Sequence, residues 1–260
     1  MSILETISTP KDRPIVATIL GDAGLGKTSL AATFPKPIFI RAEDGLASIP
    51  EGHRPKAFPR LRSVLDLWDQ LTFLVKEDHP FGTVVIDTIT KLETMFVDHV
   101  IEADPKNPRG IQQAFGGYGA GRDMVSSMHR RVRKAADVLV ERGINVVFVA
   151  HADTVRIEPP DADPYTKFSV RLHEKSMQPY VDDVDLVGFL RLETYVTGDG
   201  ERKKAISDGT RQLVCHVVAS NVSKNRFGIT EPLTVKLGEN PLTPFIPYLQ
   251  TKSPIKAKGE

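Results

Sequence analysis

The sequence predicts an α/β fold with a mostly parallel central sheet and helices on both faces. Short apolar runs rich in β-branched residues recur along the chain, as expected of strands that are buried on both sides. Segments with helical patterns separate these runs. A glycine-rich loop stands between the first apolar run and the first helical segment, which is the order of a strand-loop-helix unit.

Length and composition indicate one domain with a substantial core. The chain has 260 residues, 40% of them hydrophobic, and a net charge of +1. We expect one domain over residues 1–250, with residues 1–13 as an N-terminal arm and residues 251–260 as a flexible C-terminal tail. The global field is weak, so any affinity for nucleic acid must come from local basic loops.

The sequence also predicts a cytoplasmic protein. The first 14 residues have no apolar core of a signal peptide, and no segment reaches the roughly 20 apolar residues of a membrane span. The single cysteine, Cys215, has no partner for an internal disulfide and lies in an apolar run. We therefore expect no membrane partner.

The strands and helices are expected to alternate along the chain. Apolar runs predict strands at residues 14–20, 37–41, 83–86, 144–150, 184–192 and 213–219. Helical patterns occupy residues 28–34, 64–76 and 123–142. Gly198-Asp199-Gly200, within residues 197–210, predicts a β-hairpin as a C-terminal extension of the sheet.

Two long connections, residues 102–121 and 152–175, show no regular pattern. Connections of this length in a compact domain are typically functional or disordered. We interpret both as loops.

The glycine-rich loop matches the phosphate-binding pattern G-x-x-x-x-G-K-[ST] in the required strand-loop-helix context. The predicted nucleotide-binding residues are Gly21, Asp22, Ala23, Gly24, Leu25, Gly26, Lys27, Thr28 and Ser29. Glycines let backbone N–H groups face an anion, Lys27 reaches the outer phosphates, and the Thr28 hydroxyl ligates Mg²⁺. The alternative is a glycine-rich turn without a ligand.

Asp87, which ends the strand predicted at residues 83–86, is the expected second magnesium anchor. The N-K-x-D pattern that selects guanine is absent from the sequence. The expected cofactors are therefore ATP and Mg²⁺.

The second strand ends in an acidic pair, Glu43-Asp44, and here the chain resembles the RecA family of ATPases. The resemblance implies that Glu43 orients the water that attacks the γ-phosphate. It also implies that His151, directly after the strand at residues 144–150, senses the γ-phosphate. A solvated carboxylate and a structural hydrogen bond are the respective alternatives.

Residues 224–228, K-N-R-F-G, resemble the bacterial RadA branch, and the related pattern K-x-R-x-G recurs in DnaB-type helicases. The resemblance implies that Lys224 and Arg226 enter the ATP site of a neighbouring subunit and neutralise charge in the transition state. It thereby implies a homo-oligomer, either a ring or a filament. A basic surface turn is the alternative.

The two long connections lie where RecA-like proteins place their DNA-binding loops. Their basic side chains suit phosphates and their aromatic side chains suit unpaired bases. The candidate DNA-binding residues are Arg109, Phe115 and Tyr118 in the first connection, and Arg156, Tyr165, Lys167, Phe168, Arg171 and Lys175 in the second.

The resemblance extends over residues 15–245 and is strongest to phage-encoded RecA-like single-strand annealing proteins of the Sak group. It implies a recombination ATPase that binds single-stranded DNA in the host cytoplasm, hydrolyses ATP at subunit interfaces and works beside a single-stranded DNA-binding protein. Two alternatives remain open: a DnaB- or RadA-like helicase or branch-migration motor, and a KaiC-like regulatory ATPase with protein partners and no DNA.

Overall fold

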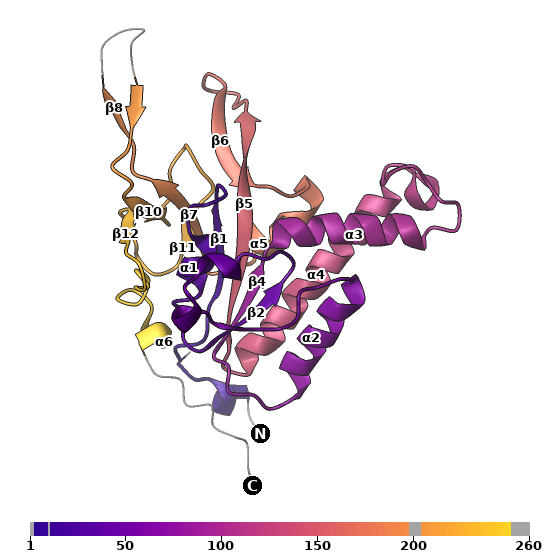
Figure 1. Cartoon of the computed structure of the whole chain (residues 1–260), viewed down its shortest axis with the longest axis horizontal. Coiled ribbons are helices and arrows are strands. Elements are labelled where there is room, and N and C mark those ends of the chain that lie inside the picture. The colour runs from indigo at the N-terminus through magenta and orange to yellow at the C-terminus, as the bar shows by residue number, and fades with distance from the viewer. Residues whose placement is uncertain (1–2, 10, 198–203, 251–260) are drawn as a thin grey trace.

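A computed structural model describes residues 3–9, 11–197 and 204–250 of the chain. Its centre is one long sheet (Figure 1). The strand order is β12 (Leu233–Val235), β10 (Arg211–Val214), β7 (Leu186–Leu192), β1 (Val16–Gly21), β5 (Asn145–Ile157), β4 (Thr83–Asp87), β2 (Pro37–Arg41) and β3 (Lys56–Ala57).

Strand β1 runs parallel to both of its neighbours, β5 and β7. Strands β2, β3 and β4 continue the parallel arrangement. Strand β10 and the short β11 (Lys224–Asn225) pair antiparallel with β7, and β12 pairs antiparallel with β10. The predicted α/β fold with a mostly parallel sheet is therefore confirmed, with antiparallel strands added towards the C-terminus.

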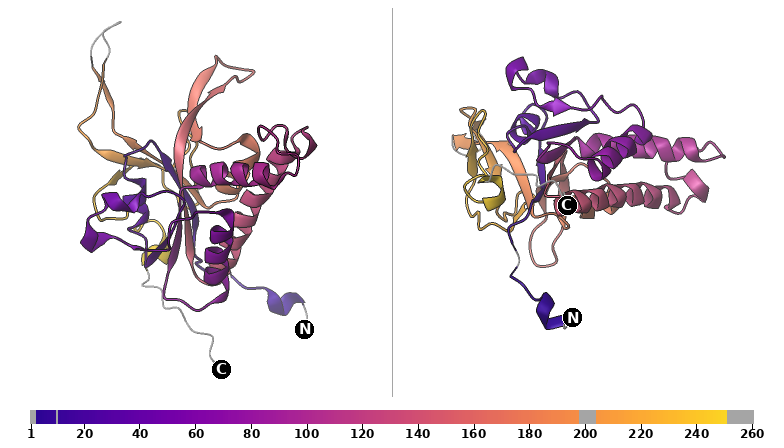
Figure 2. Two further views of the ribbon diagram at one scale, coloured as in Figure 1. Left: turned by 45° about the vertical axis from the view of Figure 1, so that its right-hand side comes forward. Right: turned by 90° about the horizontal axis from the view of Figure 1, so that it is seen from below.

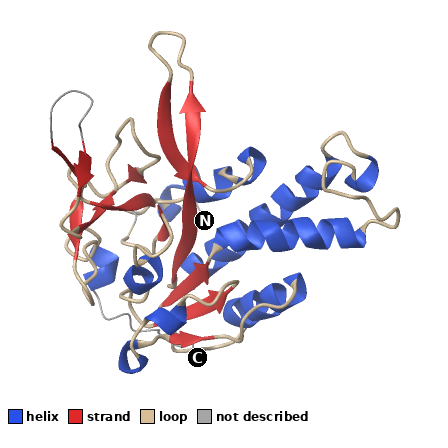
Figure 3. Cartoon of the chain, turned by 45° about the horizontal axis from the view of Figure 1, so that its top comes forward, coloured by secondary structure: helices blue, strands red, loops and turns tan. Residues whose placement is uncertain are grey.

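Helices cover both faces of the sheet. Helices α2 (Val64–Lys76), α3 (Ile89–Ala103), α4 (Ala120–Glu141) and α5 (Gln178–Val181) pack on one face, and α1 (Lys27–Ala31) and α6 (Pro247–Gln250) pack on the other. Short 3₁₀ helices occupy Ile3–Thr6, Leu46–Ser48, Glu51–His53, Ala114–Gly116 and Glu174–Ser176. Helices α3 and α4 lie side by side and extend away from the sheet (Figure 3).

Local sequence explains the regular elements. Ser63 caps α2 through a reciprocal pair of hydrogen bonds with Asp66, and Leu67, Leu71 and Leu74 form its buried stripe. Strand β4 is buried along its whole length because helices or connecting segments cover both of its faces.

The second long connection differs from the prediction. Strand β5 does not end before His151 but continues to Ile157, and it pairs antiparallel with β6 (Tyr165–Val170). The resulting β5–β6 hairpin projects beyond the sheet (Figure 1). Residues 152–157 alternate between the two faces of the ribbon, but their polar composition does not resemble a buried parallel strand. The prediction of a structureless loop from residue 152 is therefore wrong for this part.

Two further segments differ in extent. The apolar run at residues 213–219 is a strand only as far as Val214, and β10 instead begins earlier, at the polar Arg211. Strands β8 (Tyr195–Thr197) and β9 (Lys204–Ile206) pair as an antiparallel ribbon, while the predicted turn at residues 198–200 lies outside the described residues.

The 3₁₀ helix Ile3–Thr6 lies apart from the body of the molecule (Figure 2). Its apolar side chains Ile3 and Leu4, like Ile7 just after it, are largely exposed. Among the helices of the described residues, none combines the length and the apolar character needed to cross a membrane.

Candidate active site

Parallel register aligns the site along one edge of the sheet. Gly21 is paired with His151, Asp87 with Val149, and Arg41 with Asp87. Because parallel strands all end at the same edge, the side chains that follow β1, β2, β4 and β5 converge there.

Two glycines shape the loop between β1 and α1. A Cβ on Gly21 would lie 2.4 Å from the carbonyl oxygen of Leu190, so only glycine allows β1 and β7 to approach so closely at this point. Gly26 has a φ of 91°, in the left-handed region that favours glycine, and caps α1. The loop therefore turns back over the end of β1 and delivers Lys27 to the first position of the helix.

Lys27 is a buried cation at this edge, with 6% of its surface exposed. Its Nζ donates to the Asp22 carbonyl at 2.8 Å and lies 3.4 Å from Nδ1 of His151. Burial lowers the pKa of Lys27, while the charges of Asp87 and Glu43 act in the opposite direction. A buried ammonium group of this kind gains favourable interaction energy when an anion enters.

Thr28 and Asp87 form the predicted magnesium pair. The Thr28 hydroxyl donates to Oδ2 of Asp87 at 2.8 Å. Burial raises the pKa of Asp87 to about 6, and the charge of Glu43 adds to the rise, whereas the Thr28 hydrogen bond and Lys27 oppose it. A carboxylate and a hydroxyl that meet in this way supply the hard oxygen ligands that Mg²⁺ prefers.

Glu43 and His151 lie next to this pair. Nε2 of His151 is 3.2 Å from Oε1 of Glu43, and the backbone N–H of His151 donates to Thr90 at 3.0 Å. The hydrogen bond from His151 lowers the pKa of Glu43 against the opposing effect of burial, so the carboxylate is ionised at neutral pH. His151 thus connects Glu43 with Lys27.

These residues line a cavity of about 680 Å³, which falls in the size range of small-ligand sites. Ala23, Gly24, Gly26 and Ser29 also line it, whereas Asp22 and Leu25 line a second cavity of about 610 Å³. The buried cation, the pair of oxygen ligands and the available volume fit a nucleoside triphosphate with Mg²⁺. The predicted roles of the individual residues remain predictions.

Sequence reasoning missed several residues that line this cavity, and Arg211 is the basic one among them. Its side chain lines the cavity, and its Nη1 lies 3.0 Å from the position that a Cβ on Gly26 would take. Arg211 belongs to the polar first position of β10, far from the glycine-rich loop in the sequence. Only the antiparallel pairing of β10 with β7 brings the two together, and no local pattern signals that pairing.

Lys224 and Arg226 lie away from the cavity. Strand β11 pairs with β7 at Val187 and Leu186, towards the start of that strand, whereas the loop lies near Leu190 at its far end. The structure therefore does not bring these two residues to the nucleotide site of their own chain.

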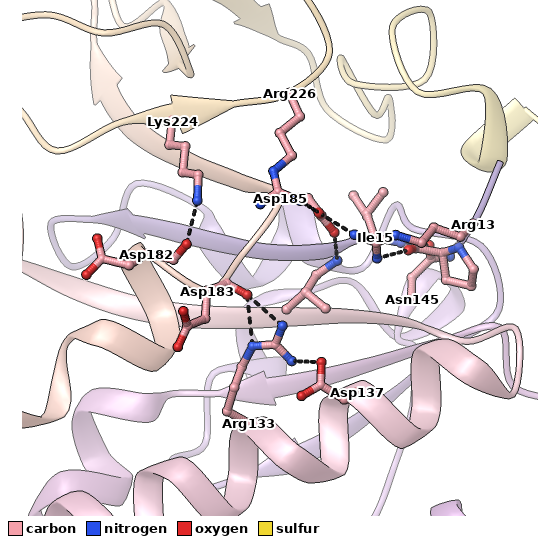
Figure 4. Close-up of polar contacts among 12 residues, drawn as sticks. Arg13, Ile15, Arg133, Asp137, Asn145, Asp182, Asp183, Asp185, Lys224 and Arg226 are labelled. Carbon is pink, nitrogen blue, oxygen red and sulfur yellow. Dashed lines mark hydrogen bonds and ion pairs between the residues drawn. The ribbon is translucent and has the colours of Figure 1, made fainter. Parts of the chain in front are cut away.

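Within the chain both residues contact an acidic segment (Figure 4). Lys224 Nζ donates to the Asp182 carbonyl at 2.5 Å. Arg226 Nη1 lies 3.1 Å from Oδ1 of the buried Asp185, and Arg13 approaches the same oxygen at 2.7 Å. Arg226 nevertheless leaves more than half of its side chain exposed.

The first predicted DNA loop connects α3 and α4. Arg109, Phe115 and Tyr118 are all exposed there, and Tyr118 is fully so. Phe115 and Tyr118 have backbone φ angles of 53° and 52°, which residues other than glycine rarely adopt. The backbone N–H of Phe115 is held by the buried Asp104 carboxylate at 2.5 Å.

The second group lies on or beside the β5–β6 hairpin. Tyr165 and Arg156 are exposed, and Arg156 pairs with Glu158 at 2.9 Å. Phe168 differs from the prediction, because its ring stacks on Phe189 with centroids 5.0 Å apart and packs against the core. Phe168 is therefore partly buried, and it also lines the second cavity.

The remaining three residues of the second group are basic. Lys167 is partly buried on β6, and Arg171 donates to the Ala152 carbonyl at 2.8 Å. Lys175 pairs with Asp123 of α4 at 2.7 Å.

Comparison with known proteins identifies the family to which the chain belongs. A model of the AAA domain family matches residues 13–227 of this chain. No curated protein matches the chain. Among solved structures, the chain is similar to a KaiC-like protein from the hyperthermophilic archaeon Pyrococcus horikoshii, at 12% identity and a TM-score of 0.45 over 88% of each chain.

Proposed function

The chain belongs to the AAA domain family, and on this premise we propose that this P-loop ATPase binds single-stranded DNA in recombination and hydrolyses ATP between copies of itself. The observation that carries the ATPase half is the convergence of Lys27, Thr28, Asp87 and Glu43 at one edge of the sheet. The DNA and assembly halves follow from the resemblance to RecA-like proteins and from the placement of exposed residues.

The site residues divide the chemistry of hydrolysis among them. Lys27 and the backbone amides of the loop bind the outer phosphates, and Glu43, ionised and hydrogen-bonded to His151, orients a water for attack. Mg²⁺, held by Thr28 and Asp87, would neutralise charge on the β- and γ-phosphates. Burial of Lys27 and Asp87 strengthens these electrostatic interactions because water is largely excluded around them.

The connection between the nucleotide and DNA runs through β5. His151 lies in that strand, its carbonyl accepts from the backbone N–H of Arg171 at 2.9 Å, and the charge of Arg171 contributes to the lowered pKa of Lys27. A shift of His151 on loss of the γ-phosphate would therefore be transmitted to both strands of the β5–β6 hairpin.

The proposed DNA surface includes both predicted segments, because they lie next to each other. Lys175 pairs with Asp123 at the start of α4, and Ser126 donates to the Lys175 carbonyl at 2.5 Å. Tyr118 and Phe115 provide exposed rings in the first segment, and Tyr165 provides one at the start of β6 in the second. Exposed rings beside cations are the features that single strands favour.

One observation favours the second candidate, a KaiC-like regulatory ATPase with protein partners. The tip of the β5–β6 hairpin carries Glu158, Asp161 and Asp163, all exposed. Acidic side chains at this position repel a phosphate backbone and suit a basic protein surface.

The test measures the ATPase rate of the wild type and of Lys27→Ala with and without single-stranded DNA, at low and moderate salt. We expect DNA to stimulate the wild type, the stimulation to fall with salt, and Lys27→Ala to be inactive. ATPase activity that ignores single-stranded DNA at low salt would contradict the DNA half of the proposal and favour the regulatory candidate. Directional unwinding of a forked duplex would favour the helicase alternative.

A further inference from the structure

The position of Arg211 follows from sheet register. Arg211 pairs with Leu192 of β7, and Gly21 at the end of β1 pairs with Leu190 of the same strand. Arg211 therefore lies just beyond the point where β1 turns into the glycine-rich loop.

The register also determines on which face of the sheet the Arg211 side chain lies. Side chains two residues apart on a strand share a face, and Leu213 is buried in the same cluster as Leu30 and Ala31 of α1. Arg211 consequently lies on the α1 side of the sheet, level with the start of that helix. Its contact distance of 3.0 Å from the virtual Cβ of Gly26 agrees with this placement.

The guanidinium group of Arg211 has no ion pair or hydrogen bond with any other residue of the described ranges 3–9, 11–197 and 204–250. Other arginines of this chain are paired, including Arg13, Arg122 and Arg226. A half-buried cation that faces a cavity without a partner is suited to an anion supplied from outside.

The charges around the cavity support the same conclusion. Its acidic residues, Glu43, Asp44 and Asp87, come from the β2 and β4 side, and Lys27 lies among them. Arg211 is the cation on the other side of the loop, towards β7 and β10. A polyphosphate in the loop would thus meet Lys27 on one side and Arg211 on the other.

We propose that Arg211 binds a phosphate group of the nucleotide in the same chain as the glycine-rich loop. The inference rests on the proposed nucleotide function of that loop and adds a binding residue to it. The planar guanidinium can donate two parallel hydrogen bonds to a phosphate, which an ammonium group cannot reproduce.

The test measures equilibrium binding of a fluorescent ATP analogue with Mg²⁺, and its competition by ADP and by inorganic tripolyphosphate. The proteins are the wild type, Arg211→Ala, Arg211→Lys and Lys27→Ala. Lys236→Ala is the matched control, because Lys236 lies close by on the same edge, is exposed and does not line the cavity. Thermal unfolding without nucleotide shows whether each variant is folded, and Arg211→Gln replaces Arg211→Ala if the latter is not.

We expect Arg211→Ala to bind the analogue about tenfold or more weakly, Arg211→Lys to be intermediate, and Lys236→Ala to match the wild type. Tripolyphosphate should lose affinity by the same factor, since the contact is to phosphate. Unchanged affinity in Arg211→Ala beside lost affinity in Lys27→Ala would overturn the role of Arg211 and leave the nucleotide site intact. A loss confined to nucleotides, with tripolyphosphate unaffected, would also overturn it. A wild type that binds none of these ligands would instead refute the proposed function.

Discussion

At the scale of one residue, the buried carboxylate of Asp87 lowers the stability of the folded protein. The carboxyl is 2% exposed and close to Glu43, so ionisation is costly until a cation arrives. Its pKa of about 6 lies above the value in an unfolded chain, so the folded protein binds more protons between about pH 4 and 6. The free energy of unfolding therefore falls as the pH rises through this window and stays lower above it.

Asp87→Asn should remove this penalty. Without nucleotide and magnesium, we expect the variant to be more stable than the wild type at pH 8, by up to about 3 kcal/mol, and no more stable near pH 4. At pH 8 the variant should also lose the stabilisation that Mg-ATP gives the wild type. Denaturant unfolding at the two pH values and thermal shifts with Mg-ATP measure both effects. Equal pH dependence in the two proteins would argue against a raised pKa.

Glu43→Gln separates binding from hydrolysis. The amide preserves the size of the side chain but removes the charge that orients water, so we expect near-normal nucleotide affinity with turnover reduced about a hundredfold or more. Glu51→Gln is the matched control, since Glu51 lies later in the same connection, is exposed and does not line the cavity. Comparable losses of turnover in the two variants would contradict the assignment of Glu43.

Sequence reasoning located those cavity residues that a local sequence pattern marks. The glycine-rich pattern gives the loop together with Lys27 and Thr28, and an acidic residue after an apolar strand gives Asp87. The structure places these residues together. Arg211 could not be predicted as a cavity residue, because its spatial neighbour Gly26 is distant in the sequence. The pairing of β10 with β7 that brings them together is a feature of the tertiary structure. The packing of Phe168 on Phe189 was not foreseen, because the exposure of an aromatic ring depends on which face of a hairpin packs on the core.

At the scale of elements, the segment after β2 closes over the magnesium pair. Gly45 precedes the 3₁₀ helix Leu46–Ser48 with an ordinary φ of −81°, so its backbone would accept alanine. An added Cβ, however, would lie 2.9 Å from the Thr28 hydroxyl and 3.2 Å from Oδ2 of Asp87. The packing of this segment therefore depends on the absence of one methyl group.

Gly45→Ala should push the Thr28 and Asp87 side chains apart. We expect a severalfold rise in the magnesium concentration needed for half-maximal ATPase activity. Gly52→Ala lies later in the same connection, where a Cβ would meet nothing within 4 Å, and it should behave like the wild type. Titrating magnesium while measuring the ATPase activity of both variants makes the comparison. An unchanged magnesium dependence in Gly45→Ala would show that the segment moves aside without affecting Thr28 and Asp87.

Elements with strong periodicity were predicted well, and marginal ones were not. The helix predicted at residues 64–76 has the observed bounds, and in the structure the Ser63 cap and the buried leucines stabilise it there. The first helix proved to be shorter than predicted, at Lys27–Ala31, since the chain turns out of helical geometry before Pro35. The β5–β6 hairpin was missed because its strands are largely exposed towards their free end and so lack the apolar signature of the core strands.

For the whole molecule, the sheet separates the glycine-rich loop from Arg226. The glycine-rich loop lies at the carboxyl end of β1, whereas Arg226 lies beside the start of β7. If copies stack head to tail, the Arg226 end of one chain faces the loop end of the next. Strand order could not be predicted from the sequence, because apolar runs of similar composition do not specify which strands become neighbours.

Mixing two inactive variants tests this arrangement. Lys27→Ala and Arg226→Ala should each lose most ATPase activity, and their mixture should regain part of it, because some interfaces combine an intact loop with an intact Arg226. Arg13→Ala is the control, since it also removes an ion pair with Asp185 but has no proposed role in the neighbouring site. The Arg13 and Arg226 side chains are about half exposed, and in either variant the buried Asp185 carboxylate keeps the other arginine and the backbone N–H of Val16 as partners, so neither loss should unfold the protein. Mixtures that remain inactive would refute shared sites.

The length of β5 has a mechanical consequence. One unbroken ladder runs from the core at Asn145 to Ile157, so there is no joint between the buried half of the strand and its free end. From His151 onward the ribbon extends about 20 Å, and a tilt of about 5° at its base would carry its end through nearly 2 Å. A movement of β5 at His151 that is too small to disturb the packing of the nucleotide site would thus become a larger movement at the free end of the β5–β6 hairpin.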